Sequence, residues 1–466
     1  MSMWRAALLI VWSSLLAGIS PVQANIELTP SITASQYWTD NRELATEKLS
    51  QEDAITEIKP EIRLTLSSRR HRGELGASYQ HLTYHRANET RSFQQYRAST
   101  NSELFPDLLF LDLSAGRVQS AITQLDAVAV NNRTLSTNRT DVSTVGIKPY
   151  LVQQWNSRWR SRIDYDYQDI KYKSTLLTDS RVQEVIALTE YGGRGDNISV
   201  NFSYNRVRAE SDGITTPSEF DEIRLDTRYQ VNRAWTWLLN GGYEEDRYER
   251  STVEKTEGGF GEVGVEFSPT RKIAVSGTIG ERYFGDTASL RLLYQYNSRT
   301  GIEMSYRKDI TQTAIELNRN GESDEATPAA FDRLGNTFLV TEVFKTRSSN
   351  ALFYYQWARS RGELSGYREI RDFQLGLNQE VVDFVAASWN WSMTAKSSLD
   401  LALSVRDRET DSQIGKDRLS YVSMRVETLP TRSVSIGAEY SITRRAADIA
   451  PRYREQQAGL FISMLF

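Results

Sequence analysis

Two stretches of the chain carry arginine and aspartate at every second position, which places all of them on one face of a β-strand. The first row consists of Arg160, Arg162, Asp164 and Asp166, and the second consists of Arg224, Asp226 and Arg228. If they line the lumen of a pore, such rows set a transverse field that selects among charged solutes. They can instead pair across neighbouring strands and only keep the wall hydrated, and the mixture of both signs favours this second interpretation.

Few residues are available for nucleophilic or metal chemistry. The chain has no cysteine and only three histidines, so thiolate nucleophiles and thiolate metal sites are excluded. His81 and His85 share one face of a predicted strand, where a serine could complete a nucleophile and base pair, but the sequence identifies no such serine. We therefore expect no enzyme, no cofactor and no metal site, and two histidines that are exposed in a lumen.

The elements that carry these rows are predicted to be strands with one apolar and one polar face. Trp159, Ile163 and Tyr165 alternate with the first charged row. The same alternation recurs at 54–67, 198–204, 222–231, 288–296, 399–405 and 434–442. A period of two indicates strands, whereas a helix would repeat near every 3.6 residues. Soluble β-sandwiches also alternate, so the period alone does not place the strands in a membrane.

The lengths of the connections favour a transmembrane barrel. Tight turns are predicted near 69–70, 105–107, 156–157, 193–196, 232–234, 269–271, 298–300, 347–349, 395–397 and 429–431. Longer connections are predicted at 39–52, 120–139, 312–333 and 363–381. Short periplasmic turns and longer extracellular loops are typical of outer-membrane barrels. The predicted fold class is all-β, a transmembrane antiparallel up-and-down β-barrel of about 22 strands, within a range of roughly 18 to 24.

Six tryptophans flank three of the predicted turns, and their parity is that of the apolar face. They are Trp155, Trp159, Trp235, Trp237, Trp389 and Trp391. Because Trp and Tyr collect at the membrane interfaces of barrels, we expect these residues to be interface aromatics. Stacking on a sugar is the alternative, and the lipid-facing parity argues against it.

Both ends of the chain carry signals for export and assembly. Arg5 precedes an apolar run over 6–19, and this pattern predicts a signal peptide, residues 1–24, cleaved between Ala24 and Asn25. The apolar run is too short for a membrane helix, which needs about 20 residues. The alternation of the last strand ends at Phe466, which resembles the terminal strand by which outer-membrane barrels are recognised for insertion. We expect residues 25–466 to form the barrel, in the outer membrane of a Gram-negative bacterium.

The composition argues against several other classes of protein. Apolar residues make up 39% of the chain and aromatic residues 11%. This is too little apolar character for several soluble cores, and too many aromatic residues for extensive disorder. The net charge of −4 gives no reason to expect a nucleic-acid partner.

Two regions resemble the outer-membrane proteins associated with PEP-CTERM and exosortase systems. The first is a proline-led strand, Pro30 to Ala34, followed by a Tyr/Thr-Asp-Asn loop that ends at Asn41 and a second strand with Pro60 at its centre. The second is the segment 388–399 together with the last strand. That strand opens with Tyr453, Arg454, Glu455 and Gln456, where the family tends to show Tyr-x-Glu-Asn.

The resemblance implies association with exopolysaccharide biosynthesis and export, and it supplies no catalytic residues. The expected function is a porin-like pore or conduit that serves exopolysaccharide export. Its expected partners are outer-membrane lipid, the barrel assembly machinery during insertion, and periplasmic polysaccharide export components with their polysaccharide. The alternatives are a general small-solute porin and a plugged structural or adhesive barrel that acts through its outer loops.

Overall fold

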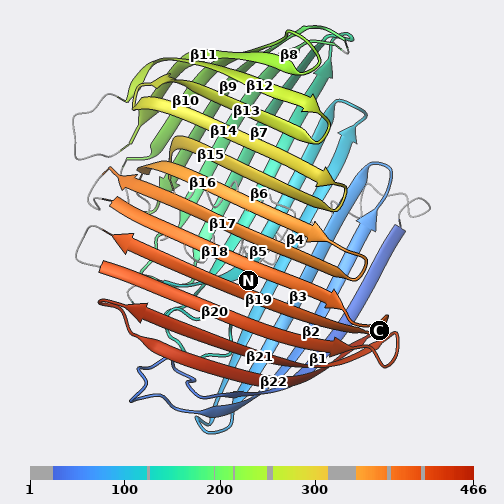
Figure 1. Cartoon of the computed structure of the whole chain (residues 1–466), viewed down its shortest axis with the longest axis vertical. Coiled ribbons are helices and arrows are strands. Elements are labelled where there is room, and N and C mark those ends of the chain that lie inside the picture. Colours follow the sequence, from blue (N-terminus) through green and yellow to red (C-terminus); the bar gives the residue numbers. More distant parts are fainter. Residues whose placement is uncertain are drawn as a thin grey trace.

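A computed structural model of the chain describes residues 25–122, 126–193, 195–213, 216–248, 256–312, 343–374, 379–410 and 415–466. These residues form 22 antiparallel strands that close into one barrel (Figure 1). The predicted fold class and strand number are confirmed. The predicted signal peptide, including Ala24 at its cleavage site, lies outside the described residues, and Asn25 is the first residue of β1.

The strands are between 10 and 17 residues long, long enough to cross a bilayer at a tilt. Their bounds are β1 Asn25–Thr39, β2 Asp53–Ser67, β3 His71–Tyr84, β4 Glu89–Phe105, β5 Leu109–Ser120, β6 Thr140–Gln154, β7 Trp159–Tyr172, β8 Ser180–Tyr191, β9 Ile198–Ser211, β10 Ser218–Gln230, β11 Trp235–Arg247, β12 Glu257–Thr270, β13 Ile273–Arg282, β14 Gly285–Asn297, β15 Thr300–Gln312, β16 Val343–Gln356, β17 Ser360–Phe373, β18 Gln379–Ser392, β19 Ser397–Thr410, β20 Gly415–Thr428, β21 Val434–Ala447 and β22 Tyr453–Leu465.

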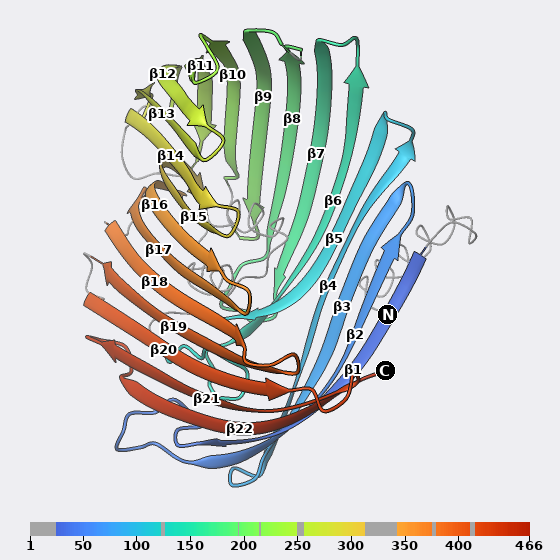
Figure 2. The same ribbon diagram turned by 45° about the vertical axis from the view of Figure 1, so that its right-hand side comes forward.

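Each strand pairs with the next one along the chain, and β1 also pairs with β22 (Figure 2). In this closing pair Ser31 lies opposite Leu465 and Thr39 lies opposite Gln457. Closure leaves no exposed sheet edge that could pair with another chain. Asn25 lies opposite Ser67, at the end of the barrel with the tight turns, so that end is periplasmic by the usual arrangement of such barrels.

The two faces of the barrel wall differ in polarity, as alternation requires. Outward side chains include Ile163, Phe202 and Leu239, which are each at least half exposed, and such residues form the belt that lipid covers. Neighbouring inward positions such as Asp164 are polar and buried. Within the described ranges no helix is long and apolar enough to cross a bilayer.

Two of the predicted connections are wrong. The turn predicted at 347–349 lies inside β16, and the long connection predicted at 363–381 contains most of β17. The polar composition of both stretches is typical of loops, but here the charges serve the inward face and the outer rim, where Arg347 pairs with Asp372 at 3.3 Å. Most of the predicted connection 312–333 lies outside the described residues. The other predicted turns coincide with observed connections or adjoin them.

Candidate functional site in the barrel lumen

The connection between β5 and β6 folds into the lumen, and we call its described part, residues 126–139, the infolded segment. Leu135 of this segment is 7% exposed. It packs against inward side chains of β1, β2 and β3, namely Tyr37, Ile55, Leu82 and Tyr84. Burying one large apolar side chain contributes about 1.5–3 kcal/mol. An apolar cluster therefore holds the infolded segment against this side of the barrel.

Arg133 adds an ionic anchor to the same segment. Its guanidinium lies 3.0 Å from Glu57 on β2 and 3.2 Å from Glu439 on β21. It also donates a hydrogen bond to the Tyr37 hydroxyl at 2.7 Å and lies 3.6 Å from the centre of that ring. Burial acts to lower the pKa of Arg133, but Tyr37 and the two carboxylates outweigh burial and hold that pKa above its ordinary value. Arg133 therefore stays a cation that ties the segment to two separate strands.

The packing of Tyr37 beneath Arg133 depends on a residue without a side chain. Gly459 lies opposite Tyr37 on β22, and a Cβ atom at this glycine would overlap the tyrosine ring. The ring can therefore lie flat against the inner face of β22. Its upper face is then free to receive the guanidinium of Arg133.

Further contacts join the infolded segment to the last strands of the barrel. The Tyr453 hydroxyl donates a hydrogen bond to the carbonyl of Val128. Asn131 donates one to Gln457 at 2.9 Å. Arg445, whose side chain is fully buried, binds both Asp417 and the carbonyl of Asp126. These contacts place β20–β22 on the same covered side of the lumen as β1–β4.

The connection between β1 and β2, residues 40–52, supports the infolded segment. Leu44 is 1% exposed and packs with Ala127 and with inward residues of β20 and β22. The amide of Leu135 donates a hydrogen bond to the carbonyl of Arg42 at 2.6 Å. We call the inward faces of β1–β4 and β20–β22, with the two segments packed on them, the sealed wall.

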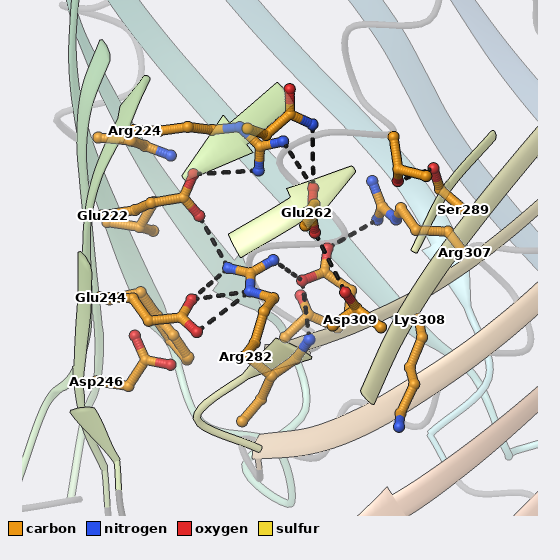
Figure 3. A pocket seen from close by; sticks show the side chains of 18 of the residues that line it. Glu222, Arg224, Glu244, Asp246, Glu262, Arg282, Ser289, Arg307, Lys308 and Asp309 are labelled. Atoms are coloured by element: carbon orange, nitrogen blue, oxygen red, sulfur yellow. Dashed lines mark hydrogen bonds and ion pairs between the residues drawn. The ribbon is translucent and has the colours of Figure 1, made fainter. Parts of the chain in front are cut away.

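Another part of the lumen is lined by charged side chains instead. A cavity of about 500 Å³ lies against the inward face of β10–β15, which we call the charged wall (Figure 3). Its lining includes five inward carboxylates and three inward guanidinium groups: Glu222, Glu244, Asp246, Glu262, Asp309, Arg224, Arg282 and Arg307. The acids therefore outnumber the bases in this set.

Arg282, the last residue of β13, lies at the centre of this network (Figure 3). It contacts Glu244 on β11 with Nε to Oε2 at 3.0 Å, and Glu222 on β10 at 2.9 Å. Asp309 on β15 is 3.9 Å away. One guanidinium thus bridges carboxylates from three strands. Because Glu244 is only 2% exposed, loss of Arg282 would leave a buried charge without this partner.

Two arginines of the charged wall also lie over an aromatic ring. The guanidinium carbons of Arg224 and Arg282 are 5.5 and 5.2 Å from the centre of the Phe260 ring on β12. Opposite Phe260 stands Gly242, and a Cβ atom there would lie 2.8 Å from the ring. This close approach lets Phe260 lie against the wall, where it holds the two cations in place.

The predicted row on β7 is paired with its neighbours rather than free. Arg162 contacts Asp164 at 2.8 Å and lies over the ring of Tyr150. Asp166 lies 3.8 Å from Lys148, and Arg160 lies 3.9 Å from Glu190 on β8. None of the four residues of this row lines the cavity of Figure 3.

The predicted row on β10 contributes one residue to the cavity. Arg224 lines it and reaches Glu262 at 3.1 Å and Asp226 at 2.7 Å. Arg228 lies further towards the periplasmic end and pairs with Glu266. Sequence reasoning missed Arg282 and Arg133, which organise the two walls. Parity alone could have marked Arg282 as inward, but nothing in the sequence places Arg133 inside the barrel.

The predicted interface tryptophans all lie on the outside, near the tight-turn end. Trp155, Trp159, Trp235, Trp237, Trp389 and Trp391 are 38–67% exposed. Trp389 and Trp391 stack with ring centres 5.7 Å apart. Phe466 is 74% exposed, and its amide donates a hydrogen bond to the carbonyl of Pro30 at 3.0 Å.

The expected place of the histidines in the lumen is wrong. His81 stacks with Tyr79, which is 41% exposed, while Leu82 and Tyr84 of the same strand are the buried inward residues. His81 thus faces outward. Its Nδ1 lies 2.9 Å from the Ser92 hydroxyl, a contact that the sequence did not reveal. Among the described residues no group of three or more His, Asp or Glu side chains could hold a metal ion.

No family model and no curated protein matches this sequence. Among solved structures the chain is similar to the FrpB iron transporter from Neisseria meningitidis, with a TM-score of 0.53 and 8% identity, over 97% of this chain and 83% of that one. It is also similar to BauA, the ferric preacinetobactin receptor from Acinetobacter baumannii, with a TM-score of 0.51 and 8% identity, over 95% of this chain and 81% of that one. Identity this low shows a shared fold. With its apolar outer belt, the chain is a β-barrel of the Gram-negative outer membrane.

Proposed function

We propose that the barrel is a conduit for hydrophilic solutes, and that the passage follows the charged wall. The observation that carries this proposal is the cavity of about 500 Å³ inside the barrel, lined by charged side chains from β10–β13 and β15. A solute that sheds part of its water there meets fixed charges and hydrogen-bonding groups. The sealed wall offers no comparable surface, because the infolded segment covers it.

The charge of the lining predicts which solutes pass most easily. Asp221 and Lys308 also line the cavity, so the lining holds six carboxylates and four cationic groups and has an excess of negative charge. In a confined lumen such an excess favours cations and neutral polar solutes over anions. We therefore expect the conductance to be cation-selective.

Exopolysaccharide is the transported polymer that we propose. The resemblance to PEP-CTERM-associated outer-membrane proteins supports this substrate, with periplasmic export components as partners. Carboxylates and the amide of Asn240, which also lines the cavity, are groups that bind sugar hydroxyls. Uptake of an iron chelate, which the names of the similar structures suggest, fits this wall less well, because an anionic chelate would meet the excess of carboxylates.

The experiment is single-channel recording of the refolded full chain in a planar bilayer. A salt gradient gives the ion selectivity, and a neutral oligosaccharide is then added to one side. Steady cation-selective conductance that the oligosaccharide blocks is the expected result. Conductance that is indifferent to sugar would contradict the polysaccharide and favour a general porin. A silent bilayer would contradict the conduit and favour a plugged structural barrel.

The plugged barrel is the second candidate because of the infolded segment. Its apolar cluster and the ion pairs of Arg133 fix it in the lumen, as a permanent closure requires. Intact binding of cells or matrix by a barrel that does not conduct would support this candidate.

A further inference from the structure

Two arginines face each other on the outer surface of the last hairpin. Arg444 on β21 and Arg454 on β22 are directly opposite in the antiparallel register, and both are exposed. Inward neighbours such as Arg445 and Tyr453 are buried, so the two arginines point away from the lumen. Like charges directly opposite each other in a sheet repel and cost stability. An anion that binds between Arg444 and Arg454 would relieve this repulsion.

Neither guanidinium of this pair is neutralised within the part of the chain that the structure describes. The nearby carboxylate of Asp40 accepts two hydrogen bonds from Gln456, and Asp448 lies 3.9 Å from Arg452. Outward arginines at comparable positions on other strands do have acids. Arg347 pairs with Asp372 at 3.3 Å, and Arg206 pairs with Glu219 at 3.3 Å.

The height of the pair on the barrel indicates what the counter-anion is. Along β21 the outward residues below Arg444 are Ile436, Ala438, Tyr440 and Ile442, and Ile436 and Tyr440 are 44% and 42% exposed. Along β22 the apolar outward stripe ends at Ala458, and the next outward residues towards the far end of the barrel are Gln456 and Arg454. The arginines thus lie where the lipid-facing stripe stops, at the end of the barrel opposite the tight turns. In an outer membrane this is the level of the phosphorylated headgroups of the outer leaflet.

We propose that Arg444 and Arg454 together bind a phosphate group of the outer-leaflet glycolipid, lipid A. Guanidinium groups suit this ligand because their donors match the oxygens of a phosphate in fork geometry. One phosphate between the two cations would turn their repulsion into two attractive contacts. The acyl chains of the same lipid would lie on the apolar stripe below, over Tyr440 and Ile442.

The test measures lipid retained by the refolded full chain, using native mass spectrometry with purified bisphosphorylated lipid A. The Arg444→Gln, Arg454→Gln double variant should retain roughly tenfold less of this lipid than the unmodified chain, as expected when charge-assisted contacts are lost. The Arg347→Gln variant is the matched control, because it removes an outward arginine that already has an acid. It should retain the lipid fully.

Several outcomes would overturn the proposal. One is equal retention by the double glutamine variant. Another is equal retention of phosphatidylglycerol, or full competition by inorganic phosphate, because either would mean that the site does not select the glycolipid. If the double variant fails to fold, as judged by heat-modifiable migration, the single glutamine variants and the double lysine variant decide. The single variants should each lose part of the binding and the lysine variant should keep most of it, and the opposite pattern would contradict the site.

Discussion

The sealed wall and the charged wall both bury arginines among carboxylates, yet they use them differently. In the sealed wall Arg133 belongs to the connection between β5 and β6. It forms ion pairs with Glu57 on β2 and Glu439 on β21, which lie on either side of the closing pair β1 and β22. In the charged wall Arg282 belongs to a strand, and it forms ion pairs with carboxylates on other strands of the same wall. The first arrangement fastens a connection between strands to the barrel wall, and the second holds the strands of one wall together.

What separates the two walls is the apolar cluster. Leu135 and its neighbours exclude water on one side, whereas the cavity on the other side has no comparable cover from the infolded segment. The same ion-pair chemistry therefore closes one part of the lumen and lines an accessible space in another. Four substitutions test this comparison.

The largest effect is expected for Arg133→Ala. It leaves Glu57, which is 4% exposed, without its cation, and breaking a buried pair in this way costs about 3–5 kcal/mol. The infolded segment should loosen, so the unfolding midpoint in urea should fall and single-channel conductance should rise. Arg158→Ala is the control, since that arginine is 58% exposed and should matter little. Unchanged conductance in the Arg133 variant would show that the segment does not restrict the lumen.

Leu135→Ala tests the apolar anchor without changing any charge. Truncation of a buried leucine at the edge of a cluster should cost about 2–3 kcal/mol. We expect a lower urea midpoint and higher conductance with the same ion selectivity. Leu176→Ala, at a residue that is 78% exposed, serves as the comparison and should leave both unchanged. A shift in selectivity would mean that the segment contributes charge to the passage.

Arg282→Gln acts on the charged wall. Removal of one of four cationic groups while six carboxylates remain makes the wall more negative. The reversal potential in a salt gradient should therefore move further towards cations. The loss of the cation beside Glu244 should cost about 1.5–3 kcal/mol, less than for Arg133→Ala, because a glutamine amide can still donate a hydrogen bond to that carboxylate. Arg282→Lys keeps the charge and should keep the selectivity. A move towards anions in the glutamine variant would refute the assignment of the passage to this wall.

The smallest effect is expected for Tyr453→Phe. This change removes one hydrogen bond to the Val128 carbonyl, worth about 0.5–1.5 kcal/mol. Brief openings above the steady conductance level should become somewhat more frequent in single-channel records. Tyr440→Phe removes a hydroxyl from the outer surface instead and should not affect the openings. If both variants behave alike, the contact with Val128 does not help to hold the infolded segment.

The sequence predicts the strands well because alternation is a local property. The run from Trp159 to Tyr167 is sufficient to identify β7 and its two faces. Prediction from alternation fails where polar residues occupy both faces of a strand, as around Arg347 in β16, because the composition there is typical of a loop.

The lumen is harder to predict, because it depends on which strands adjoin and on what folds inside. Leu82 and Tyr84 are apolar inward residues, contrary to the simple rule, because Leu135 covers them. Because the inward residues of this part of β3 are apolar, His81 lies on the outward face and not in the lumen as the sequence predicted. Nor can spacing show that Arg282 would meet acids from β10, β11 and β15, since those residues are far apart along the chain.

The seam between β1 and β22 has a consequence for assembly. The other pairings all join strands that are consecutive in the chain, so each can form as a local hairpin. The pair of Ser31 and Leu465 instead spans nearly the whole chain, and contacts of such sequence separation form late because ordering the intervening chain costs the most entropy. Until then β1 and β22 are both unpaired edges. A chain truncated before β22 would keep such edges permanently, and aggregation through edge pairing is its expected fate.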